Sequence, residues 1–365
     1  EVQSVTSWAS TTLTAFLDDR QVAALKSDTR VELVEPDPHI TFSYSDPTAV
    51  WTDSTDLSAV SPGLWRSMTG GAPPNQQVQI TTWGKQAINQ STTSAGSTSA
   101  LIYILDAGVG LHEDLNVIEW VNGNDGDNIR CGTRTGLSAC NGTTWPKVTG
   151  CSTHATAVAG IAGALNNTVG VVGVYPGARI VSVSWLNPAT TTGGCLSDQS
   201  GQGSRVLTAI DWIAMDIHRA GGTKPSVINM SMNWDTPANW PEPGLTALKK
   251  AMADIGDPTR YTADPPNHLN TAPGAFIAQS AGNEYADACD YAYSPYTATA
   301  CKTGRRLQDG IMVVGAINNH GQPVVRLNDA DGFWKDVLVS GVGFEHQPGS
   351  NFGPAVETWA PGDAV

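Results

Sequence analysis

Three polar side chains lie at points of the sequence where catalysis could occur. Asp106 ends an apolar run in LDAGVG, His154 opens the small-residue run HATAVAGIAGAL, and Asn283 follows Ala281-Gly282. A carboxylate can hold an imidazole as a general base, and a side-chain amide can donate to an oxyanion. Taken singly, each residue is more often a cap, a packing residue or a turn residue. Their joint occurrence, each at a strand or helix end, favours catalysis.

Alternating strands and helices are expected to position these residues. The apolar runs are LIYIL at 101–105, RIVSVSWL at 179–186, SVINMSM at 226–232, AFIAQSA at 275–281 and IMVVGAI at 311–317. Helical stripes between them comprise Val206, Ile210, Ile213 and Ile217, and then Leu245, Leu248, Met252 and Ile255. This pattern predicts an α/β fold, in which helices cover both faces of a parallel sheet. Polar residues at the carboxyl ends of such strands share one edge.

The first 40 residues are predicted to form a small separate unit. Asp18 and Asp19 can cap a short helix that has Val22 and Leu25 on one face. Val31 and Leu33 then alternate like a strand, which Pro36-Asp37-Pro38 ends. Residues 41–100 are rich in Ser, Thr, Pro and Asp, and we interpret 41–80 as a linker or wrapping arm.

Composition excludes two classes of partner. The chain has 20 Lys and Arg against 34 Asp and Glu, a formal net charge of −14, and no basic run, so a nucleic-acid partner is not expected. No apolar stretch approaches the roughly 20 residues that cross a membrane, so no membrane partner is expected either.

The six cysteines indicate an oxidising, extracellular environment. They form no CxxC, which favours disulfides over a metal site. Six cysteines allow 15 pairings, and our hypothesis is Cys131–Cys140, Cys289–Cys301 and Cys151–Cys195. Glycosylation triplets begin at Asn89, Asn141, Asn166 and Asn229. We therefore expect a secreted glycoprotein; no signal peptide precedes Glu1, so the chain is expected to have lost its start.

Five ordered motifs resemble the subtilisin family of serine proteases, in particular its proteinase K-like branch. They are DAG at 106–108, HATAVAG at 154–160, VINMS at 227–231, SAGNE at 280–284 and SNFGPAVETWAPG at 350–362. The resemblance runs from about residue 80 to 365, and TTWGKQAIN at 81–89 resembles the start of the mature enzyme. It implies a subtilisin-like catalytic domain over 81–365. Residues 12–38 resemble the second half of the family's inhibitory propeptide, which implies a propeptide remnant over 1–40.

The resemblance implies a role for each residue of the site. Asp106 would orient His154, His154 would be the general base for a serine, and Asn283 would donate to the oxyanion. Polypeptide substrates would bind along Ser231, Met232, Asn233, Ala281 and Gly282. Ala155 and Asn233 stand where the family usually has glycine. In the family the propeptide packs on two surface helices, here those near 205–220 and 245–255, and inhibits with its tail, so it is itself a partner.

The nucleophile is the main departure from the family. No GTS motif occurs, and GSTSA at 96–100 precedes Asp106 and lacks the following proline. We therefore expect the serine on a C-terminal fragment that is a partner of this chain, in a secreted endopeptidase. The alternative is a catalytically dead pseudoprotease with a binding or structural role.

No cofactor is expected to be required, although calcium is a candidate structural ion. Glu357 aligns with a carboxylate that binds calcium in proteinase K-like relatives. The loop NGNDGDN at 122–128 is also rich in oxygen ligands, but an acidic surface loop is the alternative. There is no HExxH motif, so zinc is not expected.

Overall fold

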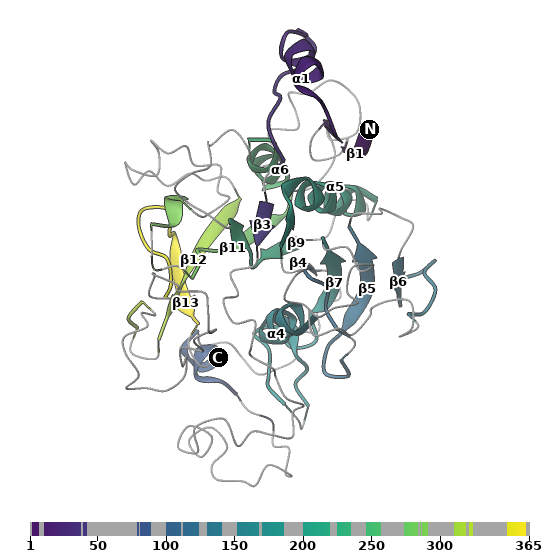
Figure 1. Cartoon of the computed structure of the whole chain (residues 1–365). Coiled ribbons are helices and arrows are strands. Elements are labelled where there is room, and N and C mark those ends of the chain that lie inside the picture. The colour runs from purple at the N-terminus through teal and green to yellow at the C-terminus, as the bar shows by residue number, and fades with distance from the viewer. Residues whose placement is uncertain are drawn as a thin grey trace, which may run out of the picture.

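A computed structural model gives the fold (Figure 1). It describes residues 2–6, 11–37, 39–41, 79, 81–88, 100–110, 112–123, 130–140, 152–167, 170–185, 200–219, 225–234, 246–256, 274–283, 285, 287–290, 310–318, 321–323 and 349–362. The part of 41–80 beyond Thr41 lies outside this set, except Gln79.

An eight-stranded sheet forms the centre of the molecule, with the order β13-β12-β11-β9-β4-β7-β5-β6. Its strands are β4 (Leu101–Asp106), β5 (Val117–Asn122), β6 (Arg130–Gly132), β7 (Arg179–Ser184), β9 (Ser226–Met230), β11 (Phe276–Ser280), β12 (Ile311–Ile317) and β13 (Thr358–Pro361). All neighbours pair in parallel except β5 and β6, which are antiparallel. The predicted α/β fold with a parallel sheet is thus confirmed.

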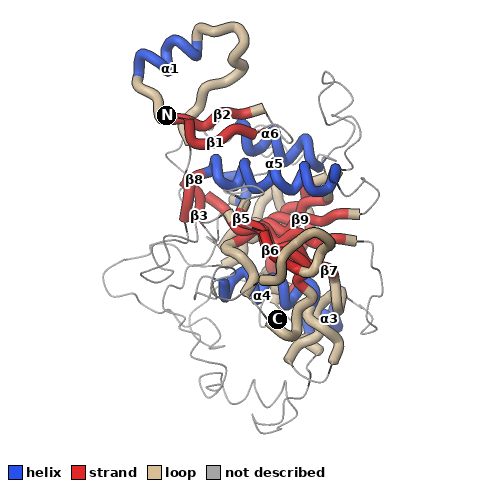
Figure 2. Tube along the Cα trace, turned by 90° about the vertical axis from the view of Figure 1, so that its right-hand side faces the viewer, coloured by secondary structure: helices blue, strands red, loops and turns tan. Residues whose placement is uncertain are grey.

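Helices lie on both sides of this sheet (Figure 2). The helices α5 (Gly203–Arg219) and α6 (Thr246–Gly256) cover one face, and α4 (Ser152–Gly163) packs on β4 and β7 from the other. A short helix, α3 (Trp83–Ala87), contacts β13. The stripe predicted for α5 is buried at each of its four positions: Val206, Ile210, Ile213 and Ile217. None of the described helices is long and apolar enough to cross a membrane.

Small residues let α4 approach the sheet closely. Its buried face contains Ala155 and Ala159, both fully buried, whereas Ile161 is 47% exposed. A Cβ atom added to Gly163 would lie 3.0 Å from the Ala178 Cβ, so a larger residue would push the helix away. The extra methyl group of Ala155 is accommodated in the apolar cluster around Ile104.

The N-terminal unit contacts α5 and α6 and lies outside the eight-stranded sheet. It contains β1 (Val2–Thr6), paired antiparallel with β2 (Thr12–Ala15), and α1 (Asp19–Lys26). Asp18 caps α1 as predicted, because its side chain accepts from the Gln21 amide. The strand predicted around Val31 and Leu33 is wrong, since residues 31–37 have no regular structure.

Acidic side chains attach this unit to the two helices. Glu35 accepts hydrogen bonds from the amides of Thr246 (3.1 Å) and Ala247 (2.9 Å), which begin α6. Asp37 accepts from the amide (2.8 Å) and hydroxyl (2.5 Å) of Ser204 in the first turn of α5. The predicted docking on these helices is therefore confirmed.

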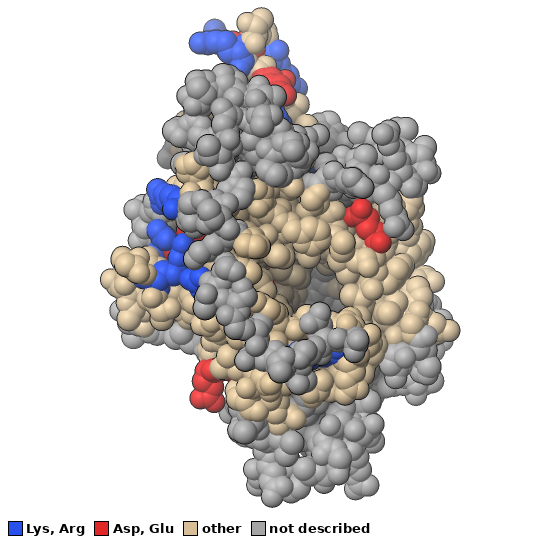
Figure 3. All heavy atoms as spheres, turned by 180° about the vertical axis from the view of Figure 1, so that it is seen from behind, with Lys and Arg blue, Asp and Glu red and all other residues tan. Residues whose placement is uncertain are grey.

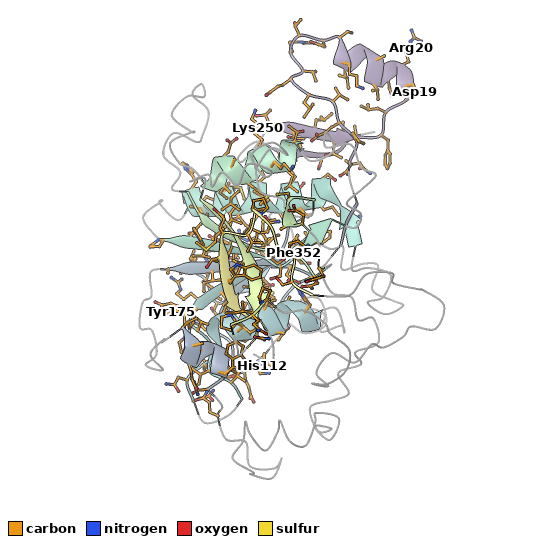
Figure 4. The ribbon with its side chains drawn as sticks, turned by 90° about the vertical axis from the view of Figure 1, so that its left-hand side faces the viewer. Asp19, Arg20, His112, Tyr175, Lys250 and Phe352 are labelled. Atoms are coloured by element: carbon orange, nitrogen blue, oxygen red, sulfur yellow. A yellow bond between two sulfur atoms is a disulfide. The ribbon has the colours of Figure 1, made fainter. Side chains whose placement is uncertain are left out.

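The predicted mode of docking is wrong, because the expected apolar residues remain partly exposed. Leu33 is 45% exposed, and Val22, Leu25 and Val31 are only half-buried. The carboxylates of Glu35 and Asp37 make the contact instead. They bind at helix N-termini, where amides without an intrahelical acceptor and the helix dipole favour negative charge. An exposed pair of Glu32 and Lys250 lies at the same junction, where Figure 4 shows Lys250.

Candidate active site

His154 and Asp106 are in direct contact at the carboxyl edge of the sheet. The His154 Nδ1 atom lies 3.0 Å from Oδ1 and 2.8 Å from Oδ2 of Asp106, although 48 positions separate the two residues in sequence. Asp106 is the last residue of β4, next to β7 and β9, and is fully buried. His154 is the third residue of α4, which packs on β4. The predicted proximity is confirmed.

Neighbouring elements fix the loop after Asp106. The Asp106 Oδ1 atom accepts from the Ala107 amide at 2.6 Å, and Gly108 has a φ of 104°. The Ser184 hydroxyl donates to the Ala107 carbonyl at 3.0 Å. Farther along, the Val109 amide donates to the Ser182 hydroxyl, and the Gly110 amide to the Thr156 hydroxyl, both at 2.8 Å.

These hydroxyl residues were missed by the sequence reasoning. Ser182 and Ser184 occupy alternate positions of the apolar run RIVSVSWL. That alternation was an available signal, because hydroxyls placed regularly within a buried strand need partners nearby.

The pKa of His154 reflects two opposing effects. Burial lowers the pKa, since the charged imidazolium loses water. The charge of Asp106 and its hydrogen bond raise it, and the pKa of His154 therefore lies above its usual value. The side chain retains 23% exposure while Asp106 has none, so the pair has a buried carboxylate and a partly accessible imidazole.

The predicted peptide-binding edge already holds a strand of the same chain. The short strand β3 (His39–Thr41) lies between β8 (Ser200–Gln202) and β10 (Asn233–Trp234), antiparallel to both. Thr41 is opposite Asn233, the residue that stands in place of the family's glycine. Ser231 and Met232 connect β9 to β10, but the Met232 side chain is fully buried in the core, so only its backbone can face a peptide.

Asn283 follows β11, two strands away from Asp106 along the same edge. Its backbone carbonyl accepts from the Gly349 amide at 3.0 Å, and the side chain of the buried Asn351 donates to the Ala281 carbonyl at 2.9 Å. Gly282 has a φ of 107°, which turns the chain at this point. The structure thus places Asn283 at the predicted edge and exposes it to solvent; donation to an oxyanion stays a prediction.

A cluster of buried charges stabilises the far end of the sheet. Glu119 of β5 is fully buried and accepts from Arg130 Nε (2.6 Å) and Arg134 (2.5 Å). Arg134 also donates to Asp216 of α5 at 2.8 Å, and Tyr103 donates to the same carboxylate at 2.8 Å. Burial raises the pKa of Glu119, although the two arginines oppose this effect.

The predicted Cys131–Cys140 disulfide is present in the segment that carries both arginines, with a Cα–Cα distance of 4.9 Å. Cys289 is also disulfide-bonded, and its proposed partner Cys301 lies outside the described residues. Cys151 and Cys195 lie outside them as well, so the third pairing stays a prediction.

Both predicted calcium positions stay predictions. Glu357 Oε2 accepts from the Val313 amide at 3.2 Å, next to β13. Most of the loop 122–128 lies outside the described residues. The described residues contain no group of three or more His, Cys, Asp or Glu side chains that could hold a metal ion.

Another group of oxygen atoms gathers beside the end of α4. The Asn167 amide donates to Asp114 at 2.6 Å, and the Gln79 amide contacts the Leu165 carbonyl (2.8 Å) and the Asn167 oxygen (3.2 Å). One carboxylate with amide and carbonyl oxygens is the kind of ligand set that Ca²⁺ accepts. Sequence reasoning missed this group because its members are about 50 to 90 positions apart.

A comparison with known families matches residues 97–363 to the subtilase family. The chain belongs to the subtilase family. Subtilisin E from Bacillus subtilis (strain 168) is 27% identical over 341 residues, which are 93% of this chain and 64% of that protein. A subtilisin from Bacillus pumilus is 28% identical over 254 residues, 69% of this chain and 68% of the relative. This subtilase chain therefore spans about two thirds of the length of these relatives.

Among solved structures, one match is titled a cold adapted subtilisin-like serine proteinase. It has 20% sequence identity and a TM-score of 0.40, over 77% of this chain and 72% of the other.

Proposed function

We propose that this subtilase is the larger part of a secreted serine endopeptidase. The observation that carries the proposal is the contact between His154 Nδ1 and the buried Asp106 carboxylate. A buried carboxylate there holds the imidazole in the tautomer whose second nitrogen can accept a proton. The disulfide at Cys131–Cys140 supports an oxidising environment, as expected outside the cell.

The proposed reaction is the two-step hydrolysis of a peptide bond. A serine hydroxyl gives its proton to His154 while its oxygen bonds to the substrate carbonyl carbon, and Asn283 donates to the oxyanion that forms. His154 then returns the proton to the leaving amine, which leaves an acyl-enzyme. Water, deprotonated by His154 in turn, hydrolyses the ester and releases the serine.

We propose that the serine comes from a segment that bears the family's GTS motif, which these 365 residues do not contain. Support comes from the sheet. Residues of β9, β11 and β12 alternate between buried and half-buried; the half-buried ones include Val227, Asn229, Ala278 and Met312. Of the buried ones, Ile228, Met230, Ile277 and Ile311 pack in one core cluster with residues of α5 and α6. The molecule is hollowed near its centre when seen from behind (Figure 3).

The N-terminal unit is proposed to act as an inhibitory propeptide. Its caps on α5 and α6 position β3 between β8 and β10, along the edge where an extended substrate would pair. A chain segment in that position competes with substrate, so activity is expected only after its removal.

Labelling of the natural full-length protein with a fluorophosphonate tests the proposal. We expect one modified serine, identified by peptide mapping within a GTS motif, and loss of both labelling and peptide hydrolysis in His154→Ala. Absence of labelling and of hydrolysis after removal of residues 1–80 would contradict the proposal and favour the pseudoprotease.

We also propose that the group around Asp114 and Asn167 holds a structural Ca²⁺. Chelation should then lower the melting temperature, and Asp114→Asn should abolish that sensitivity, because the one carboxylate ligand is gone. Glu357→Gln is the matched comparison: if it alone removed the effect of chelation, the ion would belong at the position suggested by sequence.

A further inference from the structure

The orientation of the Asp106 carboxylate depends on the backbone just after β4. Its Oδ1 atom accepts from the Ala107 amide at 2.6 Å, and both of its oxygens contact His154 Nδ1. The ladder between β4 and β7 ends at the pairing of Asp106 with Ser184, so regular strand pairing does not hold Ala107. Gly108 then turns the chain with a φ of 104°. Other contacts must therefore hold the amide that fixes this carboxylate.

Two serine hydroxyls of β7 bind the loop beyond the end of the ladder. The Ser184 hydroxyl donates to the Ala107 carbonyl at 3.0 Å, and the Ser182 hydroxyl accepts from the Val109 amide at 2.8 Å. Ser182 is fully buried and Ser184 is 1% exposed. Because water does not reach these hydroxyls, a loop group that lost its serine partner would remain without a hydrogen bond.

Both serines lie on the face of β7 that packs against α4. Alternate residues of a strand share a face, so Ser182 and Ser184 lie on the same side as Ile180. Ile180 packs in one cluster with Ala155, the residue after His154 in α4. Figure 1 shows α4 beside β4 and β7, which it contacts. The loop is therefore held on the side of the sheet that carries His154.

A hydroxyl of α4 completes the attachment of this loop. The Gly110 amide donates to the Thr156 hydroxyl at 2.8 Å, and Thr156 lies two residues after His154. The loop 107–110 is thus bonded to both β7 and α4. Because α4 carries His154 and the loop begins at Asp106, a displacement of the loop would change the geometry of the pair.

We propose that Ser182 and Ser184 are positioning residues for the Asp106–His154 pair, because their hydroxyls hold the loop that keeps the Asp106 carboxylate against His154 Nδ1. This inference rests on the proposed function. The hydrogen bonds run from Ser184 to the Ala107 carbonyl, and from the Ala107 amide to the carboxylate. Misplacement of catalytic groups by about 1 Å can lower a rate about a hundredfold, so small movements of this loop matter for the reaction.

The test compares Ser182→Ala and Ser184→Ala with the parent in the processed full-length protein. In each variant kcat for a peptide substrate should fall about tenfold, while KM changes less than about twofold, because the hydroxyls act on the base and not on substrate binding.

NMR of the imidazole provides a second measurement, with His154→Ala to identify its signals. Asp106 is the one charged group among the described residues that raises the pKa of His154. A displaced carboxylate should therefore let this pKa fall and weaken the low-field signal of the proton between Nδ1 and the carboxylate. A loss of stability alone changes neither quantity in the folded protein.

Two further variants separate the hydroxyl from packing. Ser184→Thr keeps the hydroxyl, and should keep the kcat and the His154 pKa of the parent. Ser226→Ala is the matched control and should change neither quantity. Ser226 is also buried, but it begins β9 opposite Leu101, at the other edge of the sheet.

An unchanged kcat or an unchanged pKa of His154 in both alanine variants would overturn the inference, because the hydroxyls would then stabilise the loop alone. The same losses in Ser184→Thr or in Ser226→Ala would also overturn it, since packing would be their cause. A parent protein without hydrolysis refutes the proposed function, whereas the pKa of His154 still shows whether the serines position the pair.

Discussion

The protonation of His154 is set by a balance between burial and the Asp106 carboxylate. Because the pKa is raised and the imidazole must be neutral to accept a proton, the proposed activity should fall with decreasing pH at a value above the ordinary 6.5 or so. In Asp106→Asn the amide lacks the charge, so the pKa of His154 should move down. NMR titration of the imidazole protons measures both values.

The raised pKa of His154 also predicts how the free energy of unfolding depends on pH. A folded-state pKa above the unfolded one stabilises the fold at pH below about 6.5, and this contribution disappears as the pH rises through the folded value. The His154-linked contribution should therefore be lost in Asp106→Asn chiefly at acidic pH. An unchanged pKa of His154 in the variant would contradict the assignment of Asp106 as its orienting partner.

At the scale of elements, β5, β6 and α5 are joined through buried charges. Glu119→Gln leaves Arg130 and Arg134 without their shared carboxylate, and should lower the free energy of unfolding by about 3–5 kcal/mol. Denaturant titration measures the loss. Glu32→Gln is the control, because Glu32 is 82% exposed in its pair with Lys250 and should have no measurable effect. Equal effects of the two variants would mean that the cluster does not stabilise this end of the sheet.

The Cys131–Cys140 disulfide closes a loop of nine-residue separation that contains Arg134. Replacement of both cysteines by serine should lower the free energy of unfolding by about 2–3 kcal/mol, because the unfolded chain gains conformational entropy when the disulfide is absent. If the disulfide also positions Arg134, the cost of Glu119→Gln should be smaller in the double-serine background, which a double-mutant cycle would detect. Strict additivity would show that the arginines hold their places without the disulfide.

At the scale of the whole molecule, the N-terminal unit depends on two carboxylates that cap helices. The double variant Glu35→Gln and Asp37→Asn should release the unit, because the capped amides lose their charged acceptors. Limited proteolysis should then remove residues 1–37 faster, with no change in the digestion of the remaining fold. Asp28→Asn is the matched control, since Asp28 contacts Arg30 within the unit itself.

No acceleration in the double variant would show that β1 and β3 suffice for docking. Acceleration in the Asp28 variant as well would mean that digestion reports on opening of the unit rather than on its attachment.

The sequence by itself was enough to predict the sheet strands that are continuous apolar runs, the stripe of α5, the cap of α1 and the Asp106–His154 pair. The first three features are local, whereas the Asp106–His154 pairing was predicted from the resemblance of DAG at 106–108 and HATAVAG at 154–160 to motifs of the subtilisin family. β5 was not predicted, because VIEWVN contains a buried Glu that breaks the apolar run.

Tertiary structure alone decided which distant groups meet. The acidic caps of α5 and α6, the charges around Glu119 and the contact of 281–285 with 349–352 join residues that are tens to hundreds of positions apart. Periodicity reports which face of an element is apolar, but not which partner reaches a helix end or a buried charge. The N-terminal unit shows the difference: its pattern predicted docking by Val22 and Leu25, whereas unpaired helix amides made Glu35 and Asp37 the attachment points.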